Sequence, residues 1–262
     1  MYTKELETAK ICAWEAGKAI MRIYHDVADM HVEYKDRNMP LTVADKASNE
    51  IIVKALKESF PSYAILSEEE KDNRERLDND YCFIVDPLDG TKEFIKRNGQ
   101  FTVNIALAYR HTAVMGVIYV PVTGEMYYAQ KGTGAYVQKG DGTIRKLHVS
   151  ENTDISSLRV VMSASHECEE MNQLIDKYQL KNFVKVGSSL KGCMVASREA
   201  DIYYRYNPTM EWDTAAMQCI VEEAGAIFRQ MDGTKMYYNR EDSLNRKGFY
   251  IINQEENLLT LE

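Results

Sequence analysis

This sequence of 262 residues lacks closely spaced cysteine pairs, long uninterrupted apolar runs and any excess of positive charge. The chain has no Cys-x-x-Cys pair, which argues against a disulfide framework and favours reduced thiols in the cytoplasm. Burial as small apolar side chains is the expected role of these cysteines. They are an odd number, widely spaced along the chain: Cys12, Cys82, Cys168, Cys193 and Cys219.

The most apolar long stretch, Phe101 to Val120, is interrupted by Asn104, Arg110 and His111. We therefore expect no membrane span, and the polar N-terminus predicts no signal peptide. A cytoplasmic protein follows, with peripheral association with a membrane left open. The net charge of −8 and the lack of a basic stripe make a nucleic-acid polymer an unfavourable partner. A small phosphorylated substrate fits only if cations offset the acidic groups.

The composition, 45% apolar and 27% charged, is that of a globular protein large enough for one large domain or two modest ones. Apolar residues at three- and four-residue spacing predict a helix over 4–26. A second helix is predicted from Thr42 and Asp45, as cap candidates, to Phe60. The acidic stretch 71–80 predicts a solvated loop.

The remaining chain shows two patterns of predicted elements. Short apolar runs predict strands at 64–66, 81–85, 102–109, 113–120, 125–130 and 134–138, mostly as an antiparallel meander. After about residue 150, strands at 158–162, 183–186, 201–206, 226–229 and 249–252 alternate with helices at 167–178, 189–197 and 213–224. The sequence predicts a mixed α+β (α/β) protein with parts 1–150 and 151–262 that share an interface, and a ligand in the cleft between them.

The most informative segment is Asp86-Pro87-Leu88-Asp89-Gly90-Thr91, directly after the apolar run 81–85. Pro87 fixes its own φ and Gly90 permits a sharp bend, so a turn can aim both carboxylates at one point. A helix-capping turn, in which Asp89 or Thr91 satisfies backbone amides, is the alternative.

Two further acidic segments also lie where a predicted strand ends or a predicted helix begins. Glu68, Glu69 and Glu70 come after the run 64–66, and Glu211-Trp212-Asp213 opens a helical segment. Each has an ordinary alternative, since acidic runs face water and an Asp at a helix start stabilises the dipole. Their conjunction indicates a multi-metal phosphate site, and hard oxygen ligands without His or Cys favour Mg²⁺ over zinc.

These residues resemble a known family. Leu66-Ser67-Glu68-Glu69, Asp86 to Thr91 and Trp212-Asp213-Thr214-Ala215-Ala216 are similar to motifs of the inositol monophosphatase superfamily of Mg²⁺-dependent, lithium-sensitive phosphatases. Within it, Lys92-Glu93-Phe94, the run 98–107 and Gly187-Ser188-Ser189-Leu190-Lys191 are closer to the CysQ-type 3′(2′),5′-bisphosphate nucleotidases. The resemblance implies a layered α-β-α-β-α, sugar-phosphatase-like architecture.

The resemblance also implies roles for individual residues. Two or three Mg²⁺ ions would be held by Glu68, Asp86, Asp89, Asp213 and the carbonyl of Leu88, with Glu69 close by as support. Thr91, hydrogen-bonded to Asp45, would orient and deprotonate the attacking water. A helix cap is the alternative role of Asp45.

Substrate contacts are expected from both parts. The amides of Gly90 and Thr91 would face the scissile phosphate. A second phosphate would lie on Gly187, Ser188 and Ser189, beside the charge of Lys191, although a Ser-capped helix is the alternative. His166 could contact ribose or phosphate, or be an exposed loop histidine. Glu211 belongs to the same predicted substrate set, and Gly192 stands where relatives often have an aromatic residue.

The leading hypothesis is Mg²⁺-dependent hydrolysis of the 3′-phosphate of 3′-phosphoadenosine 5′-phosphate, which yields AMP and phosphate by attack of water. An inositol or sugar monophosphate phosphatase is the second enzyme hypothesis, and a non-catalytic nucleotide sensor is a third. The expected protein is a monomer or homodimer. A dinucleotide-binding reading of Gly132-x-Gly134 lacks the third glycine, and no phosphate-binding Gly-Lys-Ser/Thr loop is present.

Overall fold

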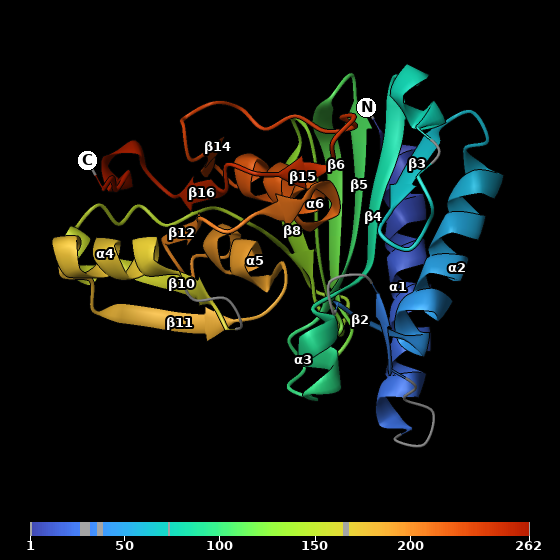
Figure 1. Ribbon diagram of the computed structural model, residues 1–262, viewed down its shortest axis with the longest axis horizontal. Helices are drawn as coiled ribbons and strands as arrows, with labels where there is room; N and C mark the ends of the chain where they lie inside the picture. Colours follow the sequence, from blue (N-terminus) through green and yellow to red (C-terminus); the bar gives the residue numbers. More distant parts are fainter. Residues whose placement is uncertain (1, 27–31, 36–38, 73, 165–167, 262) are drawn as a thin grey trace.

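The computed structural model describes residues 2–26, 32–35, 39–72, 74–164 and 168–261, and side chains from residue 42 onward after the first helix. The elements form five layers, in the order helices, sheet, helices, sheet, helix (Figure 1). This arrangement confirms the mixed α+β class and the layered architecture. No helix among the described residues has both the length and the apolarity needed to cross a membrane.

The outer helical layer consists of α1 (Thr3–His25) and α2 (Val43–Ser59), close to the predicted bounds. Thr42 begins α2 because its hydroxyl accepts a hydrogen bond from the Ala44 amide, and Asp45 accepts one from the Thr42 amide in return. The helix ends at Phe60, before Pro61. The predicted cap role of Asp45 is therefore confirmed, and it coexists with a role in the site described below.

The first sheet has the strand order β3-β4-β5-β6-β7-β8-β9. From β4 onward it is the predicted antiparallel meander, whereas β3 runs parallel to β4. The strands are β3 (Ala64–Ser67), β4 (Tyr81–Asp89), β5 (Thr102–Tyr109), β6 (Thr112–Val120), β7 (Glu125–Gln130), β8 (Gly134–Gln138) and β9 (Ile144–Lys146).

Some elements were not predicted. They include β9, the separate pair β1 (Val32–Lys35) and β2 (Met39–Thr42), and a 3₁₀ turn, η3 (Glu75–Asp78), inside the expected loop 71–80. Strand β9 is fully exposed, so it lacks the apolar signal by which a strand is recognised.

The second sheet has the order β11-β10-β12-β16-β14. Helix α4 covers the face that carries Val160, Ile202 and Ile252, and the middle helices cover the opposite face. The strands are β10 (Arg159–Ser163), β11 (Asn182–Val186), β12 (Ile202–Arg205), β14 (Ile227–Gln230) and β16 (Phe249–Ile252).

The remaining elements complete the second part and the turns between layers. Helix α6 begins at Glu211 instead of the predicted 213, because Asp213 caps the helix from inside its first turn. The helices are α3 (Thr91–Ile95), α4 (Glu169–Tyr178), α5 (Leu190–Ala196) and α6 (Glu211–Glu223). The short pieces are β13 (Thr209–Met210), β15 (Leu244–Asn245), η4 (Ile155–Ser157) and η5 (Glu255–Asn257).

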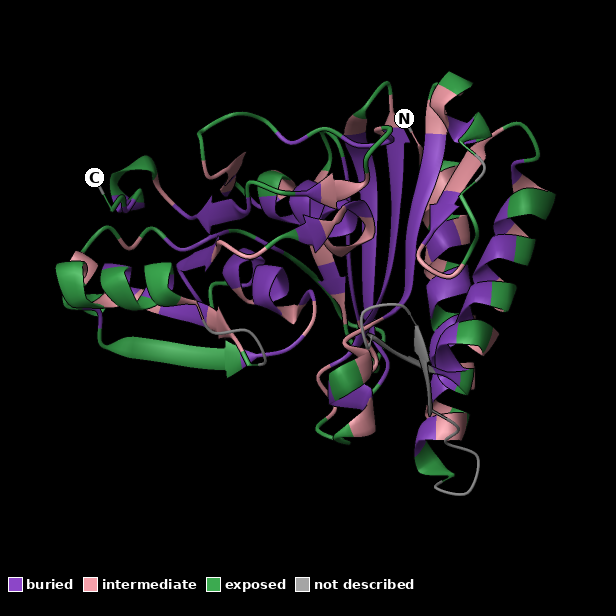
Figure 2. Ribbon diagram, in the orientation of Figure 1, coloured by how far each residue is buried: buried purple, intermediate pink, exposed green. Residues whose placement is uncertain are grey.

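Helix α6 lies in the middle layer and is buried against both parts of the chain. It approaches β6 so closely that a Cβ at Gly116 would lie 2.4 Å from the Ala216 carbonyl oxygen. One hydrophobic core joins Ile84 and Ile118 of the first sheet to Ile220 of α6 and Ile251 of the second. Figure 2 shows this continuous buried region across the middle of the molecule. The expected parts 1–150 and 151–262 thus share a core where the site is built.

Candidate active site

Strands β3 and β4 bring the first two acidic segments together. They are parallel, with Ser67 opposite Val85, so Glu68 and Asp86 follow at neighbouring positions on one edge. The Glu68 amide donates a hydrogen bond to the Val85 carbonyl at 3.1 Å, which keeps the segments paired beyond the strand end. The pairing direction therefore produces the convergence that the sequence predicts.

The segment from Asp86 to Asp89 is an irregularity in the β4–β5 ladder. Asp86 pairs with Asn104 and Asp89 with Thr102, so Pro87 and Leu88 bulge from the strand. The Leu88 amide donates to Asp86 Oδ1 at 3.1 Å. Bulges re-aim side chains, and here the bulge turns both carboxylates to one side. Gly90, with φ of 94°, then ends the strand and begins α3.

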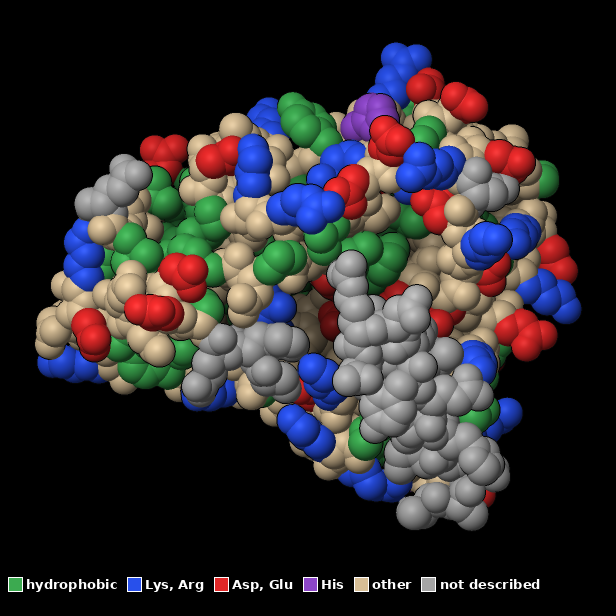
Figure 3. Space-filling model, viewed as in Figure 1, with side chains coloured by type: hydrophobic (Ala, Val, Ile, Leu, Met, Phe, Trp, Pro, Cys, Tyr) green, Lys and Arg blue, Asp and Glu red, His purple; other side chains and the backbone are tan. Residues whose placement is uncertain are grey.

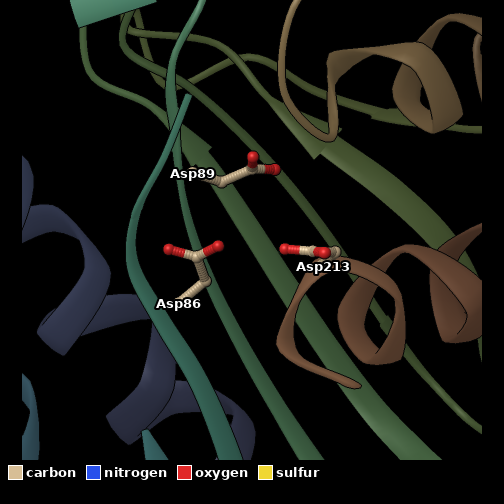
Figure 4. Close-up of side chains that lie close together, drawn as sticks. All are labelled: Asp86, Asp89 and Asp213. Atoms are coloured by element: carbon tan, nitrogen blue, oxygen red, sulfur yellow. The ribbon is translucent and has the colours of Figure 1, made fainter. Parts of the chain in front are cut away.

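Asp213, from the start of α6, meets these two carboxylates. Oxygen atoms of Asp86, Asp89 and Asp213 all lie within 4.8 Å of one another. Figure 4 shows the three side chains converging from β4 and α6. Asp213 Oδ2 also accepts a hydrogen bond from the Met210 amide at 2.7 Å, so one carboxylate caps the helix and faces the cluster. The predicted convergence of these three residues is thus present.

The electrostatics of the cluster fit divalent cations. Burial raises the pKa of Asp86 well above its ordinary value, and the neighbouring charges of Glu68, Asp89 and Asp213 raise it further. Burial, and then Asp89, raise the pKa of Asp213 to about 7. Several carboxylates cannot all be ionised in a buried site without compensating charge. Hard cations with oxygen ligands provide that charge, so the donor set suits Mg²⁺.

Thr91 and Asp45 lie together as predicted. The Thr91 hydroxyl donates to Asp45 Oδ1 at 3.0 Å and lies 3.3 Å from the Leu88 carbonyl oxygen. The other oxygen of Asp45 accepts from the amide and the hydroxyl of Thr42, at 2.8 and 2.5 Å. Asp45 is therefore a buried, oriented acceptor that fixes the position of the Thr91 hydroxyl.

Ser189 supports a carboxylate of the cluster. Its hydroxyl donates to Asp89 Oδ2 at 2.6 Å, and the Asn104 amide group donates to the same oxygen at 3.1 Å. Asn104 also donates to Ser189 at 2.9 Å. Ser189 is 2% exposed, and its hydroxyl hydrogen-bonds to Asp89 and Asn104, whereas the sequence predicts a contact with phosphate. Asn104 was missed as a site residue, although it interrupts the apolar run 101–120 and could have been found by that signal.

Gly187, Ser188 and Lys191 form a tight turn before α5. The Gly187 amide donates to the side chain of Gln100 at 2.9 Å, and Ser188 has a φ of 50°. The Lys191 ammonium donates to the Ser188 carbonyl at 2.5 Å. Burial lowers the pKa of Lys191 to about 8. The predicted phosphate cradle therefore contains one buried amine close to the acidic cluster.

The other predicted residues are placed as follows. Glu68 and Glu69 are half-buried, and the charge of Glu68 raises the pKa of Asp86. Glu211 is fully buried, and its carboxylate accepts from the backbone amides of Asn239 and Arg240 at 2.6 and 3.0 Å. The observed partners of Glu211 are thus parts of the chain, in contrast to its predicted contact with substrate. His166 lies outside the described residues.

Arg205, at the end of β12, was missed by sequence reasoning. Its Nε is buried without a hydrogen-bond partner within the described part of the chain. Its positive charge, like that of Lys191, lowers the pKa of Asp213. Arg205 lines a cavity of about 20 Å³ with Ser163, Cys168 and Asn207. Figure 3 shows a hollow near the centre of the molecule, with acidic side chains in it and basic side chains beside it.

Comparison with known proteins gives a consistent result. The model of the inositol monophosphatase family matches residues 1–258. The 3′(2′),5′-bisphosphate nucleotidase CysQ of Buchnera aphidicola is 39% identical over 247 residues, which are 92% of this chain and 91% of that protein. CysQ of Escherichia coli is 38% identical over 240 residues, 91% of this chain and 96% of its own.

Among solved structures, the crystal structure of CysQ from Bacteroides thetaiotaomicron superposes with a TM-score of 0.84 and 39% sequence identity. The match covers 97% of this chain and 99% of that one. SuhB from Bartonella henselae, at 26% identity, superposes with a TM-score of 0.83 over 96% of this chain and 94% of that one. The likeness is therefore to whole proteins and not to a shared fragment.

Proposed function

Because this chain belongs to the inositol monophosphatase family, we propose that it is a 3′(2′),5′-bisphosphate nucleotidase that requires Mg²⁺. Its substrate is 3′-phosphoadenosine 5′-phosphate, and its products are AMP and inorganic phosphate. The observation that carries this function is the convergence of Asp86, Asp89 and Asp213, from the two parts of the chain, within 4.8 Å. Similarity to nucleotidases of that name over nearly the whole chain sets the substrate class.

Two or three Mg²⁺ ions would be held by carboxylates at the edge of the first sheet and at the start of α6. When bound, Mg²⁺ supplies positive charge that offsets phosphate oxygens and lowers the pKa of water. The Leu88 carbonyl, in the bulge of β4, lies 3.3 Å from the Thr91 hydroxyl, and this supports its inclusion among the ligands. The proposed ligands are Glu68, Asp86, Asp89, Asp213 and the Leu88 carbonyl, with Glu69 in support.

Thr91 and Asp45 are proposed to handle the proton of the attacking water. The Thr91 hydroxyl donates to Asp45, so its oxygen lone pairs remain available to accept a proton from a water molecule. Asp45 keeps its orientation through Thr42, and it can accept the proton that Thr91 passes on. The chain thus provides a fixed two-residue relay beside the cluster, and no covalent phospho-enzyme is required.

The second phosphate of the substrate would meet a positively charged side of the site. Lys191 and Arg205 both act electrostatically on Asp213, so two cationic side chains lie near the acidic cluster. A dianionic phosphate is well matched by an Arg and a Lys in a partly buried site. An inositol monophosphate has no second phosphate to use them, and this difference favours the bisphosphate nucleotide. Gly187, Ser188 and the amides of Gly90 and Thr91 complete the proposed substrate contacts.

The test is a comparison of phosphate release from 3′-phosphoadenosine 5′-phosphate and from inositol 1-phosphate at saturating Mg²⁺. We expect kcat/KM for the nucleotide to exceed that for inositol 1-phosphate by at least about 100-fold, since one buried ion pair is worth several kcal/mol. Faster cleavage of inositol 1-phosphate would assign the protein to the second enzyme hypothesis. Binding of the nucleotide without any phosphate release would instead indicate a nucleotide sensor.

A further inference from the structure

A buried arginine links the loop that follows Glu68 to the 239–243 loop, which contacts the start of α6. Arg76, in η3, is only 3% exposed although its neighbours in the loop are mostly exposed. Its Nε and Nη2 donate to the Asp72 carboxylate at 3.1 and 2.8 Å, and the remaining terminal nitrogen, Nη1, donates to Asn239 Oδ1 at 2.9 Å. The guanidinium therefore uses each of its nitrogens, within its own loop and across to residue 239.

Asn239 also binds the backbone of the loop that holds Arg76. Its side-chain amide donates to the Arg76 carbonyl at 2.9 Å and to the Asn79 carbonyl at 3.3 Å. Asn239 is 3% exposed and has a φ of 55°, a conformation that Asn adopts more readily than most residues. A single asparagine thus closes three hydrogen bonds between residues that are about 160 positions apart in the chain.

Glu211 carries the connection to α6. The Asn239 amide donates to Glu211 Oε2 at 2.6 Å, and the Glu211 amide donates to the Ser243 carbonyl at 3.0 Å. Arg240 donates to Glu211 Oε1 through its backbone amide and through Nε, at 3.0 and 3.2 Å. Glu211 is two residues before Asp213 on the first turn of the helix. Movement of the 239–243 loop would therefore move the start of α6.

The loop that holds Arg76 begins at Glu68. Its first residues are fixed from the other side, because the Asn49 amide group donates to Glu70 at 2.7 Å and the Ser67 hydroxyl donates to Asn49 Oδ1 at 2.7 Å. The 68–79 loop is thus held by α2 at one end and by Asn239 at the other. These contacts leave few ways for Glu68 to shift relative to Asp213.

We propose that Arg76, Asn239 and Glu211 form a clamp that sets the spacing between Glu68 and Asp213, and so determines the affinity for Mg²⁺. They are positioning residues, since they act through the ligands and touch neither cation nor substrate. The inference rests on the metal site of the proposed function. It gives Glu211 a role that differs from the predicted substrate contact and agrees with its observed partners.

The burial of the clamp supports this role over a purely local one. Burying a guanidinium costs free energy unless all of its hydrogen bonds are made. The exposed ion pair of Arg74 and Glu241, at 2.8 Å, joins the same two loops without that cost, but an exposed pair holds its partners weakly. A buried connection in which every guanidinium nitrogen donates a hydrogen bond is stiffer than an exposed one, and a fixed ligand spacing requires a stiff connection.

The test compares two asparagines with matched burial. Asn239→Ala removes the clamp, while the control Asn253→Ala removes a 2% exposed asparagine that donates to the Ser150 and Asn152 carbonyls, remote from the ligand segments. The Kd for Mg²⁺ is measured by calorimetric titration of the metal-free full chain, and the rise of Tm with Mg²⁺ is measured separately. We expect Asn239→Ala to raise the Kd about 10-fold, as loss of a ligand-orienting contact does. Asn253→Ala should leave it within twofold.

A second variant guards against a folding failure. Arg76→Lys keeps a positive charge beside Asp72 but is too short and too narrow to reach Asn239 as well, so it should raise the Kd by a smaller factor, about 3-fold. For both clamp variants, KM for the nucleotide at saturating Mg²⁺ should stay within twofold of the wild-type value.

An equal Kd for Mg²⁺ in the Asn239→Ala, Arg76→Lys and Asn253→Ala proteins would overturn the clamp. Failure of the proposed function looks different: the wild type would bind Mg²⁺ and the clamp variants would bind it more weakly, but the bisphosphate would not be hydrolysed. A wild-type protein with no measurable Mg²⁺ binding would overturn both the clamp and the metal site.

Discussion

Replacement of Asp89 by Asn should stabilise the metal-free protein and abolish its activity. Both hydrogen bonds that Asp89 receives, from Ser189 and from Asn104, end on Oδ2. An asparagine that places its carbonyl oxygen there keeps both of them. Its amide group then occupies the Oδ1 position, where it can donate to a neighbouring carboxylate instead of repelling it. The change therefore removes a charge from the cluster while the surrounding contacts remain.

The magnitude follows from the spacing of the charges. Carboxylate oxygens of Asp86, Asp89 and Asp213 lie within 4.8 Å of one another. At an effective dielectric constant of about 20, one such pair of full charges repels by roughly 3–4 kcal/mol. The pKa of Asp213, raised to about 7, means that the cluster is partly protonated near neutral pH, which reduces the repulsion. We expect a net gain of about 1–2 kcal/mol, or roughly 2–4 °C in Tm.

The difference should depend on pH. The pKa of Asp213 in the folded protein is about 7, above its ordinary value of 3.8, so the native state binds this proton more tightly than the unfolded state. Its contribution to stability is therefore lost as the pH rises from about 4 to about 7. Removing the Asp89 charge relieves part of that loss, so the advantage of the variant should grow across this window.

The assay is calorimetric unfolding in EDTA between pH 5 and about 8, together with phosphate release in Mg²⁺. Asp176→Asn is the control, because Asp176 is an exposed aspartate on α4, outside the cluster and outside the loops that contact it. Hydrolysis by Asp89→Asn should fall by at least about 100-fold, since the charge that a bound cation supplies is worth several kcal/mol. A metal-free Tm equal to or below that of the wild type would refute the electrostatic reasoning, and equal hydrolysis would refute the metal mechanism.

Three further predictions follow from the site. Thr91→Ala should lower kcat by about 10²–10⁴-fold, because general-base relays contribute that much, and leave the Kd for Mg²⁺ unchanged; a small change in kcat would remove Thr91 and Asp45 from the mechanism. Burial lowers the pKa of Lys191 to about 8, so kcat/KM for the bisphosphate should decline above that pH as the amine loses its charge. Lys191→Met should lack this decline and should lose the discrimination against monophosphates. Gly116→Ala should lower Tm in calorimetry by several degrees, since its Cβ would lie 2.4 Å from the Ala216 carbonyl and overpacking costs about 1–3 kcal/mol; an unchanged Tm would mean that α6 shifts freely on the sheet.

The sequence predicted the elements well where periodicity was strong. Helices α1 and α2 have one apolar face, and the strands of the meander from β4 to β8 have apolar residues on both faces, because these faces are buried in two hydrophobic clusters. Strand β9 is exposed, and the turn η3 buries a charged residue, Arg76, so no apolar pattern marks either element. The parallel pairing of β3 with β4 could not be predicted from the sequence either. The direction of pairing depends on the path of the loop that follows β3 and not on the four residues of the strand.

The site was predictable where a residue type has few uses. Carboxylates at the ends of apolar runs, beside Pro87 and Gly90, could be assigned from chemistry, and the structure brings Asp86, Asp89 and Asp213 together. Arg205 could not be found this way, because a charged residue at a strand end is ordinary and only its burial without a partner makes it distinctive. Glu211 shows the reverse limit, since a helix-start glutamate next to a ligand looks functional, yet its partners are Asn239 and Arg240.

The parallel direction of β3 has a consequence for which deletions the protein can tolerate. A chain that leaves the carboxyl end of β3 must travel back along the sheet before it can enter β4 at Tyr81. That return covers five residues of strand, about 17 Å, and takes at least about five extended residues of the 68–80 segment. The acidic, exposed sequence of 71–80 resembles a surface insertion that could be trimmed. The parallel pairing nevertheless sets a minimum length for this connection. Shortening it below that length would pull Glu68 away from its neighbours or detach the edge strand β3.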